Sequence, residues 1–514
     1  MRPFIINTAL FILLFSGLSI QAAELRPITH EDVWQLNRLG SPVVSPDGKR
    51  VIVQVTEPSY EEDGDVSDLW LLSVDGSAAP RRLTGLNEGE SDVSWRPDGG
   101  AIAFTTKRGN DEESQVYLLD MGGPGEAVRL TELSTGAANP VWSPDGSKIA
   151  FESKVYPGAL DDEANKAEKE ARDELKYNAS AYEIFPIRQW DHWRDDRQLH
   201  LFVQDAEPGA VASDLLAGST LVDLPGYNGV PTLSGNSLKA AWTPDGSALV
   251  FSATTNLHQA AHARVVYHLY LASLEGGEPS QLTESMDWSC TDPVFTDKGD
   301  SLFCSYSPEN AQVYNLEGVG RFDWSDGKDL GEPTVVTRGF DRSVEDFALS
   351  ENGRTLYLTA ADAGRSRVYS VPSKGGEVKA LNADSRGVYS GIQVAGRQLL
   401  ARWESSAIPS EIVRVDSRGR HRALTAFNSE RVKDIDLPPF REFWFENSQG
   451  RRVHSWLALP PGFDETKKYP LVLQIHGGPF SSSKDAGHVR WHAALLAAPG
   501  YVVLMTDYTG SVGY

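Results

Sequence analysis

Short apolar runs separated by a recurring polar turn dominate the sequence between residues 41 and 428. The apolar runs have the composition and length of strands, as in "NPVWSPDGSKIAFES" and "KAAWTPDGSALVFSA". Proline presets the φ angle of its position and glycine takes the left-handed position, so each copy predicts a tight turn between two strands. Copies of this turn, some of them degenerate, begin at Ser45, Arg96, Ser143, Thr243, Thr296 and Ser350.

A second marker follows most of these turns after a further predicted strand. That strand resembles "DLWLLSVDG" or "QVYLLDMGG", and the marker is a short stretch of the type "RRLT". Its copies begin at Arg81, Val128, Ser280, Lys379 and Arg422. One unit is therefore a hairpin, a third strand and a short fourth strand. Four-stranded units that repeat about every 50 residues are typical of β-propeller blades, so we expect an all-β propeller over residues 41–428.

The predicted number of blades is seven, with eight as the alternative. One interval between turns is about twice as long as the others and contains "LDDEANKAEKEARDELK", which is typical of a charged helix. We interpret residues 154–198 as an insertion between the second and third strands of one blade. The blades are expected to begin near Ser41, Ser91, Asn139, Lys239, Thr291, Val344 and Val388.

Residues 429–514 have a different pattern. A strand, a turn at Gln449-Gly450 and a second strand are followed by Leu471–Ile475, whose apolar character predicts burial on both faces. "HVRWHAALLAAPG" predicts a helix that ends at Gly500, and "YVVLMTDY" predicts another buried strand. Strand, turn, helix and strand in this order predict the N-terminal part of a doubly wound α/β sheet.

The N-terminus has the pattern of a secretory signal peptide. Arg2 precedes a mostly apolar run from Phe4 to Ile20, and the small residues Ala22 and Ala23 follow. We expect residues 1–23 to be removed and residues 24–40 to form a helical segment. A single membrane anchor is the alternative, but the run is short for a span. The protein is therefore expected to be exported, periplasmic or secreted, without stable membrane insertion.

Composition narrows the possible partners. The formal charge of −23 and the pI of about 4.9 argue against nucleic-acid binding, which needs a clustered basic surface. No Cys/His spacing typical of a metal site occurs, and we expect no metal and no cofactor. The two cysteines, Cys290 and Cys304, fall on neighbouring predicted strands and form either a disulfide or buried free thiols.

Propeller-like repeats followed by "YPLVLQIHGGP" and "GYVVLMTDYTGSVGY" resemble the prolyl oligopeptidase family of serine peptidases. "HGGP" and the insertion stretch "AYEIFPIRQWDHW" are similar to the branch that contains secreted dipeptidyl peptidases and acylaminoacyl peptidases. The resemblance extends from Leu25 to Tyr514. One departure is Thr509, where many relatives have arginine, so this chain lacks the side chain for any contact that the arginine makes.

The resemblance implies an acyl-enzyme mechanism with a serine nucleophile, a histidine base, an aspartate and an oxyanion hole. It makes the N–H of Gly478 one oxyanion donor, while His476 and Gly477 shape the turn. The second donor would follow the nucleophile in a G-x-S-x-G elbow, and the 514 residues contain no such stretch. Because the triad of α/β-hydrolases follows the oxyanion strand, we expect it beyond Tyr514. This chain is then the N-terminal part of a longer protein and inactive alone.

A dipeptidyl peptidase must also hold the free ammonium of its substrate. Carboxylates of the insertion or of the strand before it are candidates, namely Glu152, Glu183 and Asp191. Trp190 and Trp193 are interpreted either as a packed aromatic anchor or as part of a substrate entrance.

The sequence therefore favours an exported serine exopeptidase that releases dipeptides from short peptides. An acylaminoacyl peptidase is the close alternative, and the two differ in holding a free or a blocked N-terminus. A non-catalytic periplasmic propeller that binds partner proteins is a third possibility. The hydrolase-like strands of residues 429–514 favour a peptidase over this binding protein.

Overall fold

The computed structural model describes residues 25–60, 64–85, 89–123, 125–177, 179–182, 185–232, 235–310, 312, 314–325, 330–383, 385–478 and 480–514. The predicted signal peptide and Glu183 lie outside the described residues. Helix α1 (His30–Trp34) comes first among the helices. The Thr29 hydroxyl accepts from the N–H of Asp32, and the Asp32 carboxylate accepts from the N–H of Thr29, a capping box that explains where α1 begins.

Among the described residues, the strands between residues 43 and 423, apart from two short hairpins, follow one another in antiparallel units of four strands, and parallel pairing at Ser366 and Val388 joins the last two units into one eight-stranded sheet. The first unit comprises β2 (Val43–Val44), β3 (Arg50–Ser59), β4 (Gly64–Ser73) and β5 (Arg81–Arg82), with β1 (Arg38–Leu39) added along β3. The second comprises β6 (Glu90–Trp95), β7 (Ala101–Thr106), β8 (Gln115–Asp120) and β9 (Val128–Arg129). The third comprises β10 (Ala138–Trp142), β11 (Lys148–Val155), β14 (Gln198–Asp205) and β15 (Ser213–Asp214).

The remaining units repeat this order. The fourth comprises β18 (Ala241–Trp242), β19 (Ala248–Ala253), β20 (His268–Ser273) and β21 (Ser280–Gln281). The fifth comprises β22 (Trp288–Phe295), β23 (Ser301–Pro308), β24 (Gly318–Asp323) and β25 (Thr334–Val335). The sixth comprises β26 (Val344–Leu349), β27 (Thr355–Asp362), β28 (Arg365–Pro372) and β29 (Lys379–Ala380). The seventh comprises β30 (Val388–Ala395), β31 (Gln398–Ser405), β32 (Ile408–Val415) and β33 (His421–Ala423).

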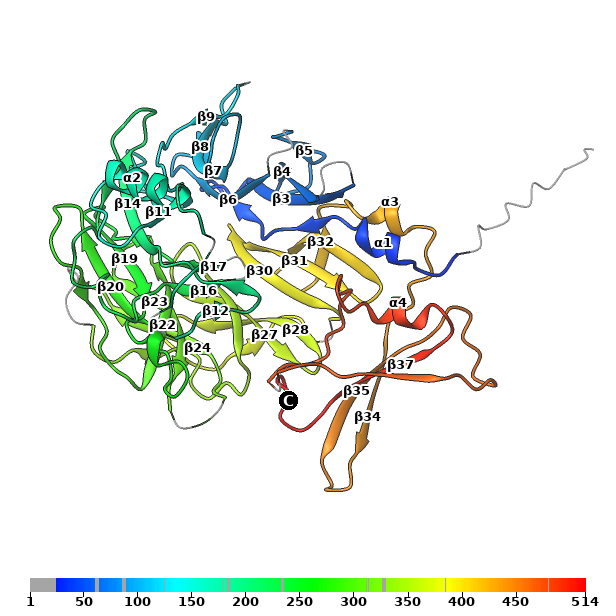
Figure 1. The fold of residues 1–514 in the computed structure, drawn as a ribbon. Coiled ribbons are helices and arrows are strands. Elements are labelled where there is room, and N and C mark those ends of the chain that lie inside the picture. The colour runs from blue at the N-terminus through cyan, green and yellow to red at the C-terminus, as the bar shows by residue number, and fades with distance from the viewer. Residues whose placement is uncertain are drawn as a thin grey trace, which may run out of the picture.

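Apolar packing between neighbouring units arranges them in a ring. Each neighbouring pair shares one buried cluster, and the last cluster joins the seventh unit to the first. In that cluster Val51 and Val53 of β3 pack with Leu400 of β31 and Ile412 of β32. Figure 1 shows the same closure, with the yellow seventh unit beside the blue first unit. Burial of apolar surface therefore holds the two ends of the ring together.

Tryptophans that precede the repeated turns connect neighbouring units by hydrogen bonds. The indole N–H of Trp95, Trp142 and Trp242 donates in each case to a backbone carbonyl of the preceding unit. The acceptors are Val43 at 3.0 Å, Ser94 at 3.2 Å and Val141 at 3.0 Å, respectively. A buried indole needs such an acceptor, which explains why tryptophan recurs at this position.

We predict that Trp142→Phe destabilises the ring by about 1–2 kcal/mol, because it removes the inter-unit hydrogen bond and part of the buried ring. Trp142 is buried in the cluster between the second and third units. Urea unfolding followed by circular dichroism measures the effect. Trp193→Phe, at an exposed position of the insertion, is the matched control and should leave the midpoint unchanged.

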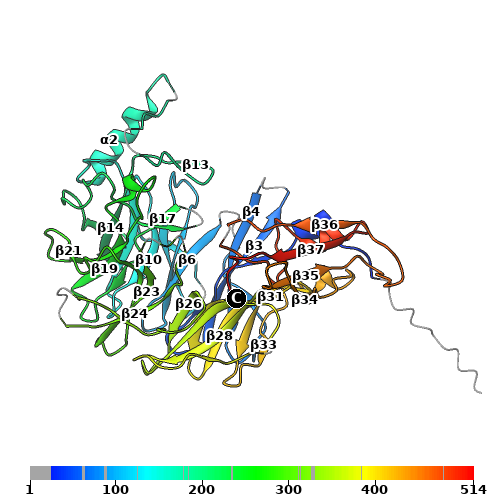
Figure 2. The same ribbon diagram turned by 90° about the horizontal axis from the view of Figure 1, so that it is seen from below.

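The insertion of the third unit lies between β11 and β14. It contains helix α2 (Asp162–Asp173) and a hairpin of β12 (Arg188–Gln189) and β13 (His192–Trp193). A second hairpin, β16 (Val230–Thr232) with β17 (Gly235–Ser237), precedes the fourth unit, and the 3-10 helix η1 (Leu257–Gln259) follows β19. The Gln189 amide donates to the carbonyl of Gly235 at 3.0 Å and joins the two hairpins. Figure 2 shows α2 and β13 projecting from one side of the ring.

The C-terminal part begins with α3 (Ser429–Val432) and forms a separate four-stranded sheet. Its elements are β34 (Arg441–Glu446), β35 (Arg452–Ala458), β36 (Leu471–Gln474), α4 (Ala493–Ala497) and β37 (Val502–Asp507). The order is β34-β35-β37-β36; β36 and β37 are parallel, and β35 is antiparallel to both of its neighbours. A core cluster that includes Trp456, Val503 and Met505 packs this sheet against α4.

Two elements of this sheet differ from the sequence expectation. The predicted helix before Gly500 begins only at Ala493, because the N–H groups of Arg490 and Trp491 bond to the imidazole Nδ1 of His488 rather than to helical carbonyls. Strand β36 is not buried on both faces: Leu471 is 59% exposed and Leu473 is 50% exposed. Within the described part of the chain β36 has β37 as its one strand neighbour, so its apolar residues on one face stay uncovered.

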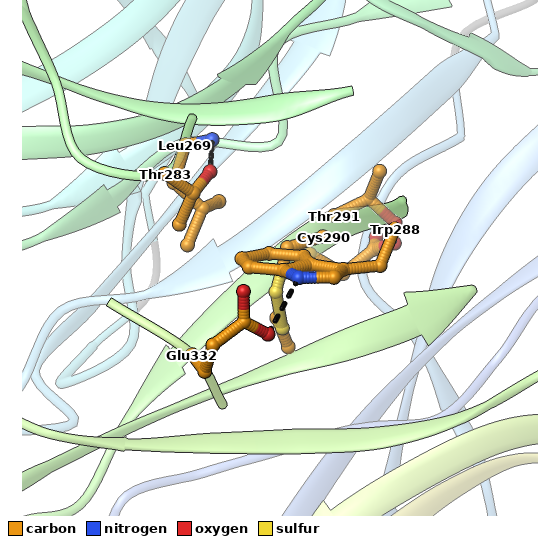
Figure 3. Close-up of a disulfide and its surroundings, with 8 residues drawn as sticks. Leu269, Thr283, Trp288, Cys290, Thr291 and Glu332 are labelled. Carbon is orange, nitrogen blue, oxygen red and sulfur yellow. Dashed lines mark hydrogen bonds between the residues drawn. A yellow bond between two sulfur atoms is a disulfide. The ribbon is translucent and has the colours of Figure 1, made fainter. Parts of the chain in front are cut away.

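Cys290 and Cys304 form a disulfide across β22 and β23, with their Cα atoms 5.6 Å apart. Cys290 lies opposite Tyr306 in the register, so the bridge connects the strands diagonally. It belongs to the cluster between the fourth and fifth units, next to Trp288, whose indole donates to Glu332 at 2.9 Å (Figure 3). Of the two states that the sequence leaves open, the structure contains the bridge.

No helix in the described ranges has both the length and the apolar character needed to cross a membrane.

Candidate functional site

The predicted oxyanion turn, His476–Gly478, directly follows β36. Gly478 has a φ of +135°, and a Cβ added there would lie 2.4 Å from the backbone nitrogen of Phe480, so only glycine fits. Gly477 and Gly478 are exposed. No hydrogen bond between described residues uses the N–H of Gly478. That N–H is therefore available to an acceptor outside the chain, as an oxyanion donor must be.

The carboxylate of Asp507, at the end of β37, organises the surroundings of this turn. Asp507 is buried, and its Oδ1 accepts from the N–H of Ser483 at 2.7 Å. Its Oδ2 lies 3.0 Å from Nδ1 of His454 and accepts from the Tyr514 hydroxyl. Nε2 of His476 lies 3.5 Å from Oδ1. One buried charge thus collects groups from β35, from both sides of the turn and from the C-terminal segment.

His476 is held by the segment that follows β37. Its ring stacks on Tyr508, with ring centres 4.5 Å apart, and its carbonyl accepts from the Tyr508 hydroxyl at 3.1 Å. Nε2 of His476 lies 2.9 Å from the Ser511 hydroxyl, which in turn donates to the carbonyl of Tyr508 at 2.7 Å. "HGGP" and "TGSVGY", two motifs recognised separately in the sequence, therefore support each other in space.

A buried histidine and tyrosine complete the Asp507 network. The Tyr514 hydroxyl lies 2.7 Å from Nδ1 of His454, and Nε2 of His454 lies 3.3 Å from Glu442. Burial and the neighbouring Asp507 carboxylate raise the pKa of Tyr514, so its hydroxyl stays protonated and donates.

We predict that Asp507→Asn destabilises the C-terminal sheet by about 3 kcal/mol, because an amide offers one acceptor oxygen where two are used and removes the charge that balances the donors. Limited proteolysis of residues 429–514 and thermal unfolding measure the loss. Asp323→Asn, whose side chain is 86% exposed in the ring, is the matched control. Equal protease resistance of the two variants would show that Asp507 does not organise the turn.

The loop after the turn is fixed to the ring by Asp485. This residue is fully buried; its Oδ1 accepts from the N–H and the hydroxyl of Ser406 at 3.2 and 2.6 Å. Its Oδ2 accepts from the N–H of Gly387 at 3.0 Å, and its own N–H donates to Gly364 at 2.7 Å. The sixth and seventh units thereby position the segment next to the candidate oxyanion donor.

The hairpin between β27 and β28 reaches into the C-terminal sheet. A Cβ on Gly364 would lie 2.4 Å from Nε1 of Trp456 and 2.8 Å from the Ser483 carbonyl, so this close approach requires glycine. Arg365 lies over the Trp456 ring at 4.9 Å and pairs with Glu442 at 2.5 Å. Apolar, cationic and hydrogen-bonding contacts therefore converge at one junction between the two parts of the chain.

The connections between second and third strands emerge from one face of the ring, because the units share one strand order and are arranged around a common centre. The Gly364 and Ser406 loops, which contact the C-terminal sheet, are such connections. So is the insertion that carries β12 and β13. The fifth unit contributes Tyr314, whose ring stacks on Phe480 of the turn at 5.1 Å. The insertion and the candidate oxyanion turn therefore lie on the same face.

The predicted substrate carboxylates have different surroundings. Glu152 is 3% exposed and accepts from Asn139 at 2.9 Å, from Ser237 at 2.9 Å and from the N–H of Leu238 at 2.8 Å. Burial raises the pKa of this carboxyl. Glu152 joins the third and fourth units and has no side open to a substrate, which argues against the predicted ammonium contact.

Asp191 lies in the β12–β13 hairpin with 69% of its side chain exposed and contacts His192 at 3.2 Å. It is accessible to a ligand. Trp190 and Trp193 beside it are 81% and 65% exposed, so they are not buried anchors. Glu183 belongs to the residues that the structure does not describe. Within the described ranges, no group of three or more His, Cys, Asp or Glu residues is placed to hold a metal ion.

A cavity of about 470 Å³ lies where α1, the loop between β31 and β32 and the segment before α4 meet. Arg402 and Glu404 of β31 contribute charged groups to the walls, as do Asp32 and Arg38, and the rest of the lining mixes apolar and polar residues. The apolar part includes Ile28, Leu36, Leu39, Ile408, Val432 and Ile435. The sequence analysis did not identify this cavity. Its one signal was the pair of charges at alternate positions of the apolar stretch "QLLARWES".

His492 borders this cavity and is 5% exposed. Burial, assisted by the neighbouring His488, lowers the pKa of His492 from 6.5 to about 4. The folded protein therefore keeps this imidazole neutral at pH values where the unfolded chain binds a proton.

We predict that this site makes the protein less stable as the pH falls from 6.5 toward 4, by up to about 3 kcal/mol, because the unfolded state binds more protons in that window. Above pH 6.5 neither state is protonated and the contribution is constant. Thermal unfolding of the wild type and of His492→Leu between pH 7 and pH 4.5 measures it, with His262→Leu on the surface as the control. Parallel pH profiles for all three proteins would contradict this assignment.

Comparisons with known proteins support the architecture. The dipeptidyl-peptidase 5 of Porphyromonas gingivalis is 25% identical over 492 residues, which cover 95% of this chain and 68% of that protein. An acylaminoacyl peptidase solved in complex with Z-Gly-Gly-Phe-chloromethyl ketone superimposes with a TM-score of 0.69 at 18% identity, covering 94% of this chain and 67% of that chain. The β-propeller domain of the Trilobed protease from Pyrococcus furiosus superimposes with a TM-score of 0.50 at 14% identity, covering 76% of this chain and 99% of that domain. No family model matches the chain.

A ring of four-stranded units joined to an α/β sheet, with a glycine turn after its parallel edge strand, matches the β-propeller plus α/β-hydrolase architecture of the structural neighbours. The similarity to dipeptidyl-peptidase 5 and to acylaminoacyl peptidase supports a peptidase of the prolyl oligopeptidase family.

Proposed function

We propose that this chain is part of an exported serine exopeptidase that releases dipeptides from short peptides. The observation that carries the proposal is the His476–Gly478 turn, whose exposed Gly478 N–H has no partner among the described residues. The likeness to dipeptidyl-peptidase 5 over 95% of the chain supports the substrate class. The apolar N-terminal segment of residues 1–23 supports export.

In this proposal the chain supplies one of the two N–H donors of the oxyanion hole, together with the hydrogen bonds that hold the turn in place. During acyl transfer, negative charge develops on the carbonyl oxygen of the scissile bond, and a pre-placed N–H stabilises it without reorganisation. The Asp507 network keeps the turn in place. The 514 residues contain no G-x-S-x-G elbow, and the proposal assigns the nucleophile, its base and its aspartate to sequence outside them.

The ring is proposed to be a seven-bladed propeller that limits access to short peptides. Its face toward the turn carries the insertion, whose hairpin presents Asp191 with Trp190 and Trp193. Asp191 is the exposed carboxylate among the predicted ammonium acceptors, whereas Glu152 is enclosed. Charge-assisted hydrogen bonds between a carboxylate and an ammonium are among the stronger polar contacts in proteins.

An acylaminoacyl peptidase is the second candidate, favoured by the solved structure with a TM-score of 0.69. The two functions differ in the group that receives the substrate N-terminus. A free amine needs a carboxylate, whereas an acylated one needs an apolar site without an unpaired charge.

The product of the complete reading frame that contains this chain tests the proposal. We predict cleavage of Gly-Phe and Lys-Ala dipeptide reporters with a kcat/KM at least about tenfold above that for acetyl-amino-acid reporters, because the acyl group removes the charge that a carboxylate recognises. Chromogenic release measures both. Cleavage of only the acetylated reporters would favour the acylaminoacyl peptidase.

The variant Gly478→Ala tests whether the His476–Gly478 turn takes part in the reaction. The added Cβ clashes with the Phe480 nitrogen and moves the N–H, so kcat should fall about 100-fold while KM changes less. Gly462→Ala, where a Cβ meets no atom within 4 Å although φ is also positive, controls for backbone strain. Equal kcat for the two variants would exclude the turn from the reaction.

A further inference from the structure

The cavity between the ring and the C-terminal sheet is lined by two charged residues, Arg402 and Glu404, that form no contact ion pair among the described residues. Its volume of about 470 Å³ falls in the range of small-molecule sites, about 300–1,000 Å³. Arg402 and Glu404 point to it from alternate positions of β31, which places them on the same face of the strand. The lining also includes Asp32 and Arg38, but these two are paired with Arg26 and Asp65, respectively.

Neither charged group has an ion-pair partner at contact distance among the described residues. The Arg402 guanidinium donates to the Ser390 hydroxyl at 3.1 Å and to the Leu39 carbonyl at 2.9 Å, both neutral acceptors. The Glu404 carboxylate forms no hydrogen bond or ion pair within the described part of the chain. Burial raises the pKa of Glu404, and the nearby positive charges of Arg402 and Lys484 oppose that rise. A partly desolvated charge without a partner is costly, so a ligand that supplies both partners gains affinity.

The spacing of the two charges suits a ligand with two ionised ends. Residues two apart on a strand are separated by about 7 Å, since a strand rises about 3.4 Å per residue. Two extended residues also span about 7 Å. The two ends of an extended free dipeptide are therefore about as far apart as the backbone positions of Glu404 and Arg402. A single amino acid is shorter, and a blocked peptide lacks one of the charges.

We propose that this cavity binds a free apolar dipeptide as a zwitterion, with its ammonium on the Glu404 carboxylate and its carboxylate on the Arg402 guanidinium. The apolar walls formed by α1 and the segment before α4 receive its side chains. This deepens the proposed function and rests on it in one respect, because a released dipeptide is the product of a dipeptidyl peptidase. The cavity is then a site where product is retained beside the domain junction.

Binding to the 514-residue chain tests the proposal without requiring catalysis. Isothermal titration with leucyl-leucine should show saturable binding. Acetyl-leucyl-leucine and leucyl-leucine amide should each bind at least about tenfold more weakly, because each lacks one ionised end. Equal binding of the three compounds would show an apolar pocket without charge recognition and overturn the proposal. Absence of leucyl-leucine binding would overturn it as well.

Variants of Glu404 and Arg402 test which residue binds the ammonium and which binds the carboxylate of the dipeptide. Glu404→Gln should weaken leucyl-leucine at least about tenfold while bringing its affinity close to that of the acetylated compound. Arg402→Gln should do the same relative to the amide. Glu377→Gln and Arg397→Gln, at exposed positions that do not line the cavity, are the matched controls and should bind as the wild type does.

Glu404 holds no other side chain by a hydrogen bond, so its variant keeps the test valid if Arg402→Gln proves unstable. Unchanged binding by Glu404→Gln, with an unchanged thermal midpoint, would exclude the site. A negative result in the reporter assay and a negative result in this titration would refute different proposals. Dipeptide binding without dipeptidyl peptidase activity would leave the site standing and remove its interpretation as a product site, whereas activity without binding would refute the site alone.

Discussion

The buried carboxylate of Asp507 is the constraint on which the candidate site depends. A charge removed from water needs donors, and Asp507 finds them in Ser483, His454 and Tyr514, with His476 nearby. These groups come from β35, from positions on both sides of the glycine turn and from the C-terminal segment. Satisfying one charge therefore fixes where the Gly478 N–H points. The chemistry proposed for the turn follows from this rigidity, since an oxyanion donor acts only when it is already in place.

A second buried carboxylate, Asp485, fixes the loop after the turn to the ring in the same way. Its contacts with Ser406 and Gly387 join the loop after the turn to the seventh unit, and its N–H joins it to Gly364 of the sixth. The ring that supplies these groups is itself closed by apolar packing between its first and last units. The apolar packing that closes the ring therefore fixes the groups that bind Asp485. The buried carboxylates of Asp485 and Asp507 in turn fix the position of the Gly478 N–H.

The sequence predicted the features that local chemistry determines. Proline and glycine mark the turns between strands, and the glycines of "HGGP" anticipate the positive φ of Gly478. Features created by distant contacts were not predictable in this way. The sequence offered Glu152 as a carboxylate available to a substrate, but in the structure it accepts a hydrogen bond from Ser237, 85 residues further along the chain. Arg402 meets Leu39 at a sequence separation of 363 residues. The apolar sequence of β36 predicted a strand buried on both faces, but Leu471 and Leu473 are exposed. An apolar sequence indicates which faces of a strand are suited to burial, but it does not indicate which elements cover them.

The cavity and the turn are connected by a short and rigid segment, which limits how a bound dipeptide affects the site. Ser483 is tied to Asp507, and Asp485 is tied to the ring, so both ends of this stretch are held by desolvated charges. Moving it would leave a buried carboxylate without donors, which costs several kcal/mol per charge, about as much as a weakly bound dipeptide gains in total. A dipeptide in the cavity therefore acts by occupying space at the domain junction and not by reshaping the turn.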